Sequence, residues 1–297
     1  MSAAPTILLT GVRGQVGFEL ARTLQGLGRI VALDRSALDL ANLNQIRCMV
    51  RKLKPQIIVN PAAYTAVDQA ETEVSQAMRV NAQAPGVLAE EAKRLNAVLI
   101  HYSTDYVFDG TKEGAYVEED APNPHSVYGH SKRMGERAIA DAGGAHLILR
   151  ASWVYGRRGQ NFLLTMRRLA AERSELQIVD DQIGAPTWAV TIAALTAQIV
   201  AQGLAAGRSD AGWWMRHAGI YHLSAAGATS WYGFAKAIFE RAPPARMPQL
   251  NPIKTEHYPR PAKRPANSRL CTDKLTRTFG LYPPAWRAAL QLCLAAD

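Results

Sequence analysis

The sequence predicts an α/β protein: a doubly wound, parallel, Rossmann-like sheet with a smaller C-terminal substrate lobe. Short apolar runs alternate with segments of helical periodicity through the first half of the chain. The first of these runs leads directly into a glycine-rich turn that opens a helix. Buried strands that alternate with helices favour right-handed βαβ units, whose strands lie parallel in one sheet.

The elements of the first half follow that alternation. Apolar runs predict strands at residues 6–11, 29–34, 56–63, 97–105 and 145–156. Apolar residues at helical spacing predict helices at 16–28, 45–55, 73–95 and 124–142. Gly28 and Pro55 close the first two helices, because glycine and proline are typical helix stops.

After residue 156 the pattern changes. Helices are expected at 161–173, 188–202 and 230–242, and strands at 176–187 and 220–224. A loop is expected at 210–219, where Trp213 and Trp214 have no assigned role, and residues 242–265 are proline-rich without periodicity. We therefore expect a dinucleotide-binding domain at 1–156, completed by roughly 177–225, and a mainly substrate-binding lobe at 157–176 and 226–297.

Composition and cysteine usage bound the class of protein. The 297 residues are 48% hydrophobic, which suffices for a sizeable core, and we see no apolar run that approaches the ~20 residues needed to span a bilayer. The N-terminus lacks a basic segment before its apolar run, so no signal peptide is expected. Three scattered cysteines indicate thiols in a reducing compartment. A cytoplasmic protein with no membrane partner is expected.

The net charge of +9 raises the question of a nucleic-acid partner. The basic residues are dispersed, with one denser run at 258–265. The sequence has no zinc-finger spacing and no basic repeat interleaved with aromatic residues. A modest positive field also suits a small anionic substrate, and we favour that interpretation over nucleic acid.

The first turn, "GVRGQVG" at residues 11–17, places glycines at GxxGxxG spacing between a strand and a helix. Glycines let the backbone approach a pyrophosphate, and a helix N-terminus supplies free N–H groups. The motif is weak alone, and a turn chosen only for packing is the alternative. Asp34, which ends the next strand, favours a dinucleotide because an acid there bonds the adenosine ribose. Arg35 suits a 2′-phosphate, so NADH and NADPH both stay open.

Small and polar residues follow the third and fourth predicted strands. Ala62 and Ala63 would let a cofactor lie close, and Thr104 and Asp105 would face the same crevice. Ligands of doubly wound sheets bind at the carboxyl ends of the strands. The alternatives are a plain loop after the third strand and a helix cap after the fourth.

Tyr128 and Lys132 lie four residues apart, which places them on one face of the predicted helix. Most such pairs are solvated surface. Hydride reduction of a ketone, however, creates an alkoxide that needs a proton donor. A nearby ammonium lowers the ordinary tyrosine pKa of ~10. Downstream of a dinucleotide turn and Thr104, the pair predicts that Tyr128 donates the proton and that Lys132 orients it and the nicotinamide ribose.

These motifs resemble the extended short-chain dehydrogenase/reductases. Nearly the whole chain is similar to one family among them, the dTDP-4-dehydrorhamnose reductases, most specifically in "GQVG", "SWVYG" and "DQIGAPT". The resemblance implies reduction of the 4-keto group of dTDP-4-dehydro-β-L-rhamnose to dTDP-β-L-rhamnose by NADPH or NADH. This is the last step of dTDP-rhamnose biosynthesis for surface polysaccharide.

The resemblance also implies the site residues. The catalytic residues would be Tyr128, Lys132 and Thr104. The cofactor would be bound by Gly11, Gly14, Gln15, Val16, Gly17, Asp34, Arg35, Asp39, Leu40, Ala62, Ala63, Tyr64, Tyr102, Tyr128 and Lys132. The substrate would be bound by Val67, Thr104, Asp105, Tyr128 and Trp153 around the sugar, and by Asn161, Gln182 and Arg260 around the dTDP part.

The chain departs from the family at one site. Some members bind magnesium through glutamates at a dimer contact, and Glu19 matches one such position. Val190 stands where another glutamate is expected, and the segment "WRAALQLCLAAD" offers none. Magnesium is therefore implied by resemblance with most of its ligands missing, and the protein is expected to be a monomer or a homodimer.

Two other functions stay open at this point. A sugar-nucleotide epimerase shares the tyrosine and the lysine, whereas a dehydratase needs an acid–base pair that is incomplete beside Thr104. The second is a non-catalytic, dinucleotide-binding regulatory subunit, which the intact Thr104, Tyr128 and Lys132 disfavour.

Overall fold

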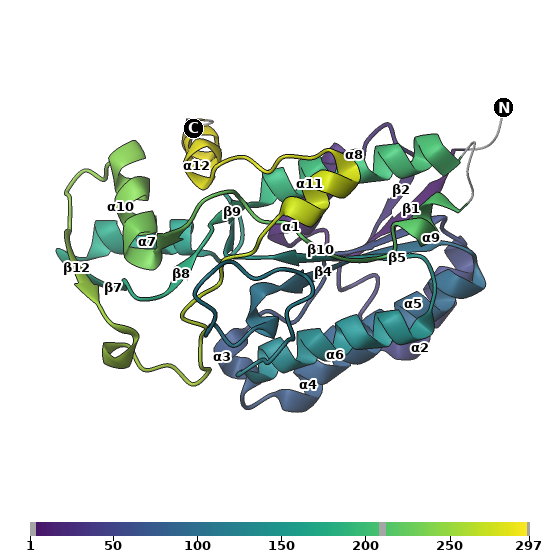
Figure 1. The fold of residues 1–297 in the computed structure, drawn as a ribbon, viewed down its shortest axis with the longest axis horizontal. Helices are drawn as coiled ribbons and strands as arrows, with labels where there is room; N and C mark the ends of the chain where they lie inside the picture. Colours follow the sequence, from purple (N-terminus) through teal and green to yellow (C-terminus); the bar gives the residue numbers. More distant parts are fainter. Residues whose placement is uncertain (1–3, 208–211, 296–297) are drawn as a thin grey trace.

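The computed structural model describes residues 4–207 and 212–295. Its centre is a six-stranded sheet in the order β2-β1-β3-β4-β5-β10, in which every neighbouring pair is parallel (Figure 1). The strands are β1 (Thr6–Leu9), β2 (Arg29–Ala32), β3 (Ile57–Asn60), β4 (Val98–Thr104), β5 (His146–Ala151) and β10 (Gly219–His222). The predicted doubly wound fold is confirmed, and the strand order reverses between β1 and β3.

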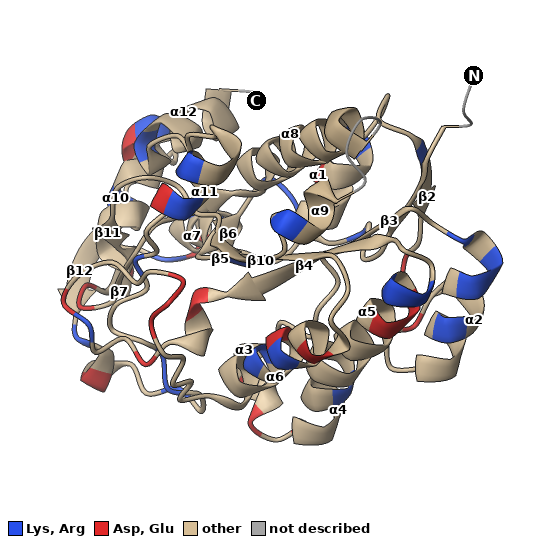
Figure 2. Ribbon diagram, turned by 45° about the vertical axis from the view of Figure 1, so that its right-hand side comes forward, with Lys and Arg blue, Asp and Glu red and all other residues tan. Residues whose placement is uncertain are grey.

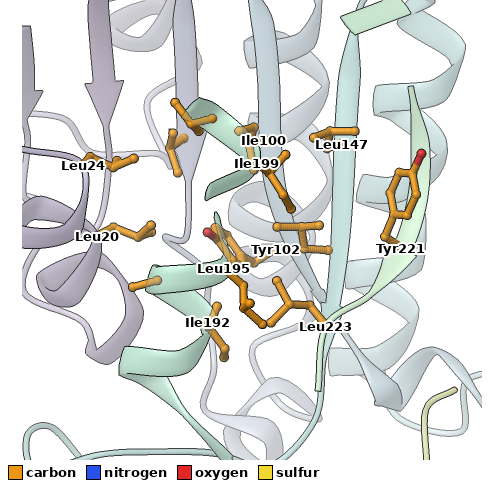
Figure 3. Close-up of a cluster of buried hydrophobic side chains, with 14 of the residues drawn as sticks. Leu20, Leu24, Ile100, Tyr102, Leu147, Ile192, Leu195, Ile199, Tyr221 and Leu223 are labelled. Atoms are coloured by element: carbon orange, nitrogen blue, oxygen red, sulfur yellow. The ribbon is translucent and has the colours of Figure 1, made fainter. Parts of the chain in front are cut away.

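Helices cover both faces of this sheet (Figure 1). One face carries α1 (Gln15–Thr23) and α8 (Ala189–Gly207), and the other carries α2 (Leu43–Leu53), α5 (Ala84–Arg94) and α6 (Val127–Ala142). Alternate residues of β1 serve the two faces: Ile7 and Leu9 join the core under α1 and α8, whereas Leu8 joins the opposite one. Figure 3 shows the first of these cores, where Ile192 and Ile199 of α8 meet the sheet.

A second, smaller core lies to one side of the sheet. It is built by α7 (Phe162–Glu172), β7 (Glu175–Val179), α10 (Trp231–Arg241), β12 (Gln249–Ile253) and α12 (Trp286–Ala295) (Figure 1). Leu163, Ile178, Phe234 and Leu290 are buried together there. This lobe takes its elements from two separate parts of the chain.

Three of the differences from the expectations lie in the second half of the chain. The single strand expected at 176–187 is three short strands, β7, β8 (Ile183–Gly184) and β9 (Thr187–Trp188). Between β7 and β8, Asp181 accepts from the Thr255 backbone N–H. The segment 242–265, expected to lack structure, contributes β12, which pairs in parallel with β7. The loop expected at 210–219 contains α9 (Trp213–Arg216), in which Trp213 stacks on His217; residues 210 and 211 lie outside the described part.

The expectation that no apolar run approaches membrane-spanning length is wrong for α8. This helix has 19 residues and a mean hydropathy of 1.6, so length and composition alone would let it cross a bilayer. The fold explains its composition, since α8 packs against α1 and the sheet and contributes buried Leu195 and Val200 to the core.

The approach of two helices limits what residue 135 can be. The segment between α4 (Val74–Met78) and α5 is a π-helical turn, η1 (Arg79–Gln83), and it packs against α6. A Cβ on Gly135 of α6 would collide with the Asn81 carbonyl oxygen of that turn. Asn81 is buried and bonds Ser131 of α6 at 3.0 Å, so the two elements have little room to separate.

We predict that Gly135→Ala lowers the free energy of unfolding. Alanine in place of a helical glycine usually stabilises by ~1 kcal/mol, but overpacking costs ~1–3 kcal/mol, and here the collision decides the sign. Gly207→Ala is the control, because a Cβ at Gly207 meets nothing within 4 Å. Denaturant unfolding measures both variants, and a Gly135→Ala protein at least as stable as the parent contradicts the packing.

Candidate active site

The carboxyl ends of β1 and β3 open into a cleft of about 520 Å³. The first turn lies on its floor, where Gly11 has a positive φ of 59° and a Cβ there would lie 2.9 Å from Ala62. A Cβ on Gly17 would collide with the Gly11 carbonyl oxygen, so both glycines are required by space. Every residue that the sequence suggested for the cofactor lines this cleft. The strand order reverses here, which is where doubly wound sheets bind nucleotides.

The acid at the end of β2 is already engaged by side chains of its own chain. One oxygen of Asp34 accepts hydrogen bonds from the Ser36 hydroxyl and the Ser36 and Ala37 backbone N–H groups, and the other lies 2.6 Å from the Arg13 guanidinium. The Ser36 hydrogen bond is the main cause that lowers the pKa of Asp34. Arg13 lines the cleft and was missed by the sequence reasoning, although it lies within the glycine motif.

Tyr128 and Lys132 line the same cleft from α6. Ser126 caps this helix by accepting from the Gly129 backbone N–H at 3.1 Å, which fixes where the first turn begins. Burial raises the pKa of Tyr128 to about 12, and the nearby Thr104 hydroxyl acts weakly in the opposite direction. The expectation that Lys132 lowers this pKa is therefore not met by the protein's own side chains. With a raised pKa, the phenol of Tyr128 keeps its proton at neutral pH.

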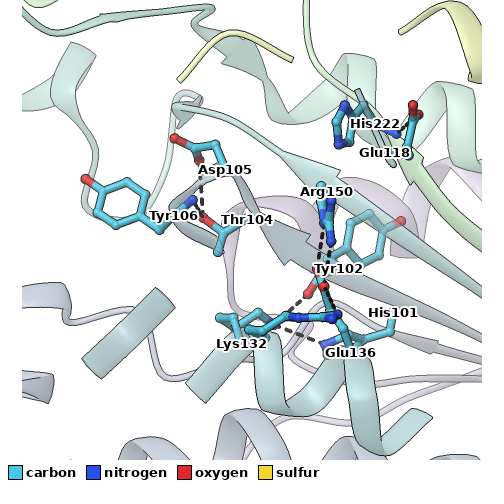
Figure 4. A network of polar contacts seen from close by, with 11 residues as sticks. His101, Tyr102, Thr104, Asp105, Tyr106, Glu118, Lys132, Glu136, Arg150 and His222 are labelled. Atoms are coloured by element: carbon cyan, nitrogen blue, oxygen red, sulfur yellow. Dashed lines mark hydrogen bonds and ion pairs between the residues drawn. The ribbon is translucent and has the colours of Figure 1, made fainter. Parts of the chain in front are cut away.

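Lys132 is buried, with 1% of its surface exposed. Its Nζ donates to the Tyr102 carbonyl oxygen at 2.6 Å and lies 3.1 Å from His101 Nε2 (Figure 4). Burial lowers the pKa of Lys132 to about 8, and the charge of Glu136 opposes that shift. The ammonium is thus held directly under the cleft by the end of β4.

Thr104 ends β4, and Asp105 begins the short helix η2 (Asp105–Val107) that follows (Figure 4). Both are buried, and the Thr104 hydroxyl donates to Asp105 Oδ1 at 3.2 Å. Burial raises the pKa of Asp105 to about 6. Among the described residues Asp105 Oδ2 makes no hydrogen bond of normal geometry, although Ser268 opposes the rise of the Asp105 pKa, so a buried acceptor lies beside the phenol of Tyr128.

A second cavity, of about 840 Å³, lies in the small lobe. Gln182 and Arg260, two of the residues suggested for the dTDP part, line it. Gln182 accepts from the Trp231 indole N–H at 3.1 Å, and the Arg260 guanidinium lies over the Tyr258 ring at 4.6 Å. The sequence reasoning missed Phe162, Trp231, Tyr258 and Arg264, which also line this cavity; the "YPRPAKRP" run was the available signal for the last two.

The remaining suggested residues line neither cavity. Asn161 is the N-cap of α7, and its amide nitrogen donates to Gln15 at 2.9 Å. Trp153 has a positive φ of 47° and stacks on Trp231 with ring centroids 3.5 Å apart. Trp231 in turn lines the second cavity.

Val67 opens the short helix α3 (Val67–Ala70). The residue after it, Asp68, accepts two hydrogen bonds from the Arg264 guanidinium, both at 2.9 Å. Arg260 lies 4.0 Å from the same carboxylate. Asp68 and Arg264, neither of them singled out from the sequence, tie the sheet side of the molecule to the loop that borders the second cavity.

The residues present do not fit the magnesium site that the resemblance implied. In the part of the chain that the structure describes, no group of three or more His, Cys, Asp and Glu side chains could hold a metal ion. Glu19 lies on α1, and Val190, a hydrocarbon without a donor atom, lies on the neighbouring α8.

Figure 2 shows basic and acidic residues interspersed over the helices in that view, without a continuous stripe of one sign.

Comparisons with known proteins agree with this geometry. The family model described as the RmlD substrate binding domain matches residues 5–297. A dTDP-4-dehydrorhamnose reductase of Burkholderia thailandensis is 48% identical, with 97% of each chain covered. One of Escherichia coli is 44% identical, covering 97% of this chain and 96% of that protein.

Solved structures agree as well. A dTDP-4-dehydrorhamnose reductase of Bacillus anthracis in complex with NADP superposes with a TM-score of 0.90 at 33% identity, covering 99% of this chain and 100% of that one. A UDP-glucose 4-epimerase of Thermus thermophilus reaches a TM-score of 0.79 at 20% identity, which shows a shared fold alone. With a family model over nearly the whole chain and relatives at 44–48% identity, this chain belongs to the dTDP-4-dehydrorhamnose reductase family.

Proposed function

We propose that this protein reduces the 4-keto group of dTDP-4-dehydro-β-L-rhamnose to dTDP-β-L-rhamnose with NADPH. The carrying observation is that Tyr128 and Lys132 line the same cleft as the glycine turn, with Thr104 beside the phenol. A proton donor therefore lies where a nicotinamide and a ketone would meet. The names of the related reductases agree with this substrate.

Each residue has a distinct part in the reaction. NADPH, when bound, supplies the hydride. Tyr128 gives its proton to the ketone oxygen as negative charge develops there, and the high pKa of the phenol keeps that proton available at neutral pH. With substrate bound, the Thr104 hydroxyl would turn its hydrogen from Asp105 Oδ1 to the same oxygen. Lys132, buried at the cleft, would bond the nicotinamide ribose and so orient the cofactor beside Tyr128.

The small lobe would bind the nucleotide part of the substrate. A nucleoside diphosphate needs a planar surface for its base and cations for its phosphates. The second cavity supplies Phe162 and Trp231 on one hand and Arg260 and Arg264 on the other. Trp153, stacked on Trp231, would then stand between the base and the reacting sugar. On this account 1–156 and roughly 177–225 bind the cofactor, and 157–176 with 226–297 bind substrate.

The state of Asp34 favours NADPH over NADH. An acid at the end of β2 selects NADH when it is free to accept from the adenosine ribose hydroxyls. Here both oxygens of Asp34 are engaged, and Arg13 and Arg35 expose most of their side chains at the rim of the cleft. Two guanidinium groups beside a compensated carboxylate suit a 2′-phosphate.

The proposed reaction also bears on where the enzyme works in the cell. The product is an activated sugar for surface polysaccharide, and we place the enzyme in the cytoplasm as a monomer or homodimer. An epimerase returns its hydride to the sugar and consumes no cofactor, and a regulatory subunit binds the cofactor without turnover. Net consumption of the cofactor separates all three functions.

The protein is predicted to oxidise NADPH when dTDP-4-dehydrorhamnose is added, followed by the absorbance of the reduced nicotinamide. Tyr128→Phe should lower kcat by ~10²–10⁴-fold with little change in cofactor affinity, because only the proton donor is lost. Tyr232→Phe, a hydroxyl deletion outside the cleft, is the control. A folded protein that oxidises neither NADPH nor NADH refutes the proposed function, and full turnover by Tyr128→Phe removes the phenol from the mechanism.

A second prediction concerns cofactor choice. Arg13→Ala should weaken NADPH binding by about tenfold to a hundredfold, since a charged hydrogen bond contributes ~1.5–3 kcal/mol. It should leave NADH binding equal or stronger, because Asp34 is released. Fluorescence titration of both cofactors measures the ratio. Arg137→Ala removes an exposed arginine that pairs with Asp141 on α6, away from the cleft, and should leave the ratio unchanged. Equal losses for both cofactors in Arg13→Ala would contradict a 2′-phosphate contact.

A further inference from the structure

Lys132 is a buried cation whose direct partners are neutral. Its Nζ contacts a backbone carbonyl of Tyr102 and the imidazole of His101 (Figure 4). Glu136, the acid whose charge favours the ammonium, is itself held by two Arg150 N–H groups at 2.8 Å. The hydrogen bonds to carbonyl and ring therefore matter more for this ammonium than for a solvated lysine.

The proton arrangement of His101 is constrained by that contact. The ring is fully buried, and burial followed by the charge of Lys132 holds the pKa of His101 well below its usual value. A neutral imidazole has one N–H and one lone pair. Nε2 can accept a hydrogen bond from the ammonium only if Nε2 is the nitrogen with the lone pair. Nδ1 then carries the ring proton and needs an acceptor of its own.

The side-chain amide of Asn60, which Thr10 holds from its other end, lies against Nδ1. The Asn60 backbone also bonds the ring and opposes the fall of the His101 pKa. The Asn60 amide lies 3.0 Å from His101 Nδ1, and its other end lies 2.6 Å from the Thr10 hydroxyl. In the structure the amide nitrogen faces Nδ1. That orientation places the ring proton on Nε2, against the ammonium.

A half-turn of the amide moves no heavy atom appreciably and reverses these roles. Its oxygen then accepts from Nδ1–H, its nitrogen donates to the Thr10 hydroxyl, and Nε2 is free to accept from Lys132. Thr10, Asn60, His101 and Lys132 are all buried. The hydrogen bonds that these side chains make with one another therefore decide between the two arrangements. Only the second one suits a charged Lys132.

We propose that His101 is a positioning residue for Lys132: its Nε2 accepts one ammonium hydrogen, and Asn60 with Thr10 fixes the tautomer that makes this possible. The Tyr102 carbonyl takes a second hydrogen. The third is left for the cleft, which Lys132 lines. The inference rests on the proposed function, because it assigns the geometry of that same lysine.

The charged and titratable groups around Lys132 come from three elements. Glu136 and Tyr128 lie on α6 itself, His101 lies on β4, and Arg150 reaches in from β5 to neutralise Glu136. Asp105, after β4, faces the phenol rather than the ammonium. Replacing His101 by a residue without a lone pair therefore changes an acceptor and leaves the net charge of the site as it was.

The test is the pH dependence of kcat/KM. With a pKa of about 8, Lys132 is charged below that pH and neutral above it, so activity is present at lower pH and lost as the pH rises through about 8. His101→Phe should move this loss to lower pH by about one unit, since the ammonium loses an acceptor that favours its charged form. The affinity for NADPH, followed by fluorescence, should weaken at a correspondingly lower pH.

Two variants separate positioning from structure. His101→Gln keeps an acceptor oxygen, so the pH at which activity is lost should return toward that of the parent. His222→Phe removes another fully buried histidine, which bonds the Cys271 carbonyl and lies away from Lys132. This variant should be less stable but should lose activity at the same pH as the parent. If His101→Phe does not fold, Asn60→Leu decides instead: it removes the acceptor for Nδ1–H and should give the same downward shift.

If folded His101→Phe or Asn60→Leu loses activity at the same pH as the parent, the proposal is overturned. An equal shift of that pH in His222→Phe would overturn it as well. These outcomes are distinct from failure of the proposed function. That failure is absence of turnover by the parent protein, whereas the pH dependence of NADPH binding tests His101 whether or not turnover occurs.

Discussion

The burial of one ammonium group between β4 and α6 is the constraint on which the rest of the site depends. Lys132 has to lie within reach of the Tyr102 carbonyl and of His101, and both contacts are short. Ser126 sets where α6 begins, and Gly135 lets α6 approach the Asn81 turn. The strand order of the sheet then decides that the same lysine lies beside the glycine turn of β1.

Burial also sets the chemistry of the neighbouring groups. It raises the pKa of Tyr128 to about 12 and that of Asp105 to about 6, and it lowers that of Lys132 to about 8. Each shift favours the neutral form, as expected when charge is moved out of water. A phenol that keeps its proton suits a reductase, whose product needs a proton on the new hydroxyl.

The sequence was a good guide wherever a local rule applied. The alternation of apolar runs and helices predicted the parallel sheet, and the glycine turn, Asp34 and Ala62–Ala63 line one cleft as expected. Thr104 and Asp105, expected to face the same cleft, are buried and do not line it. It was a poor guide where partners come from distant segments. The Arg13–Asp34 pair, the Asp68–Arg264 pair and the pairing of β12 with β7 join residues that no spacing rule connects. The bond that the Asn161 amide donates to Gln15 spans 146 residues and is likewise outside any local rule.

The pKa of Tyr128 shows the same limit in chemical form. From spacing alone a lysine one turn away lowers it, but spacing does not reveal that the Lys132 ammonium points at His101 and Tyr102 instead. The long apolar helix α8 is a related case, because only the fold shows that its side chains belong to the core.

The central claim, that Lys132 is a buried and charged lysine with a lowered pKa, is tested most directly by titrating that side chain. In protein labelled with ¹⁵N-lysine, the Nζ resonance of Lys132 is assigned by its loss in Lys132→Arg and followed by NMR against pH. A midpoint near 8, below the ordinary 10.5, is expected. A midpoint at the ordinary value, or a neutral amine throughout the stable range, would contradict it.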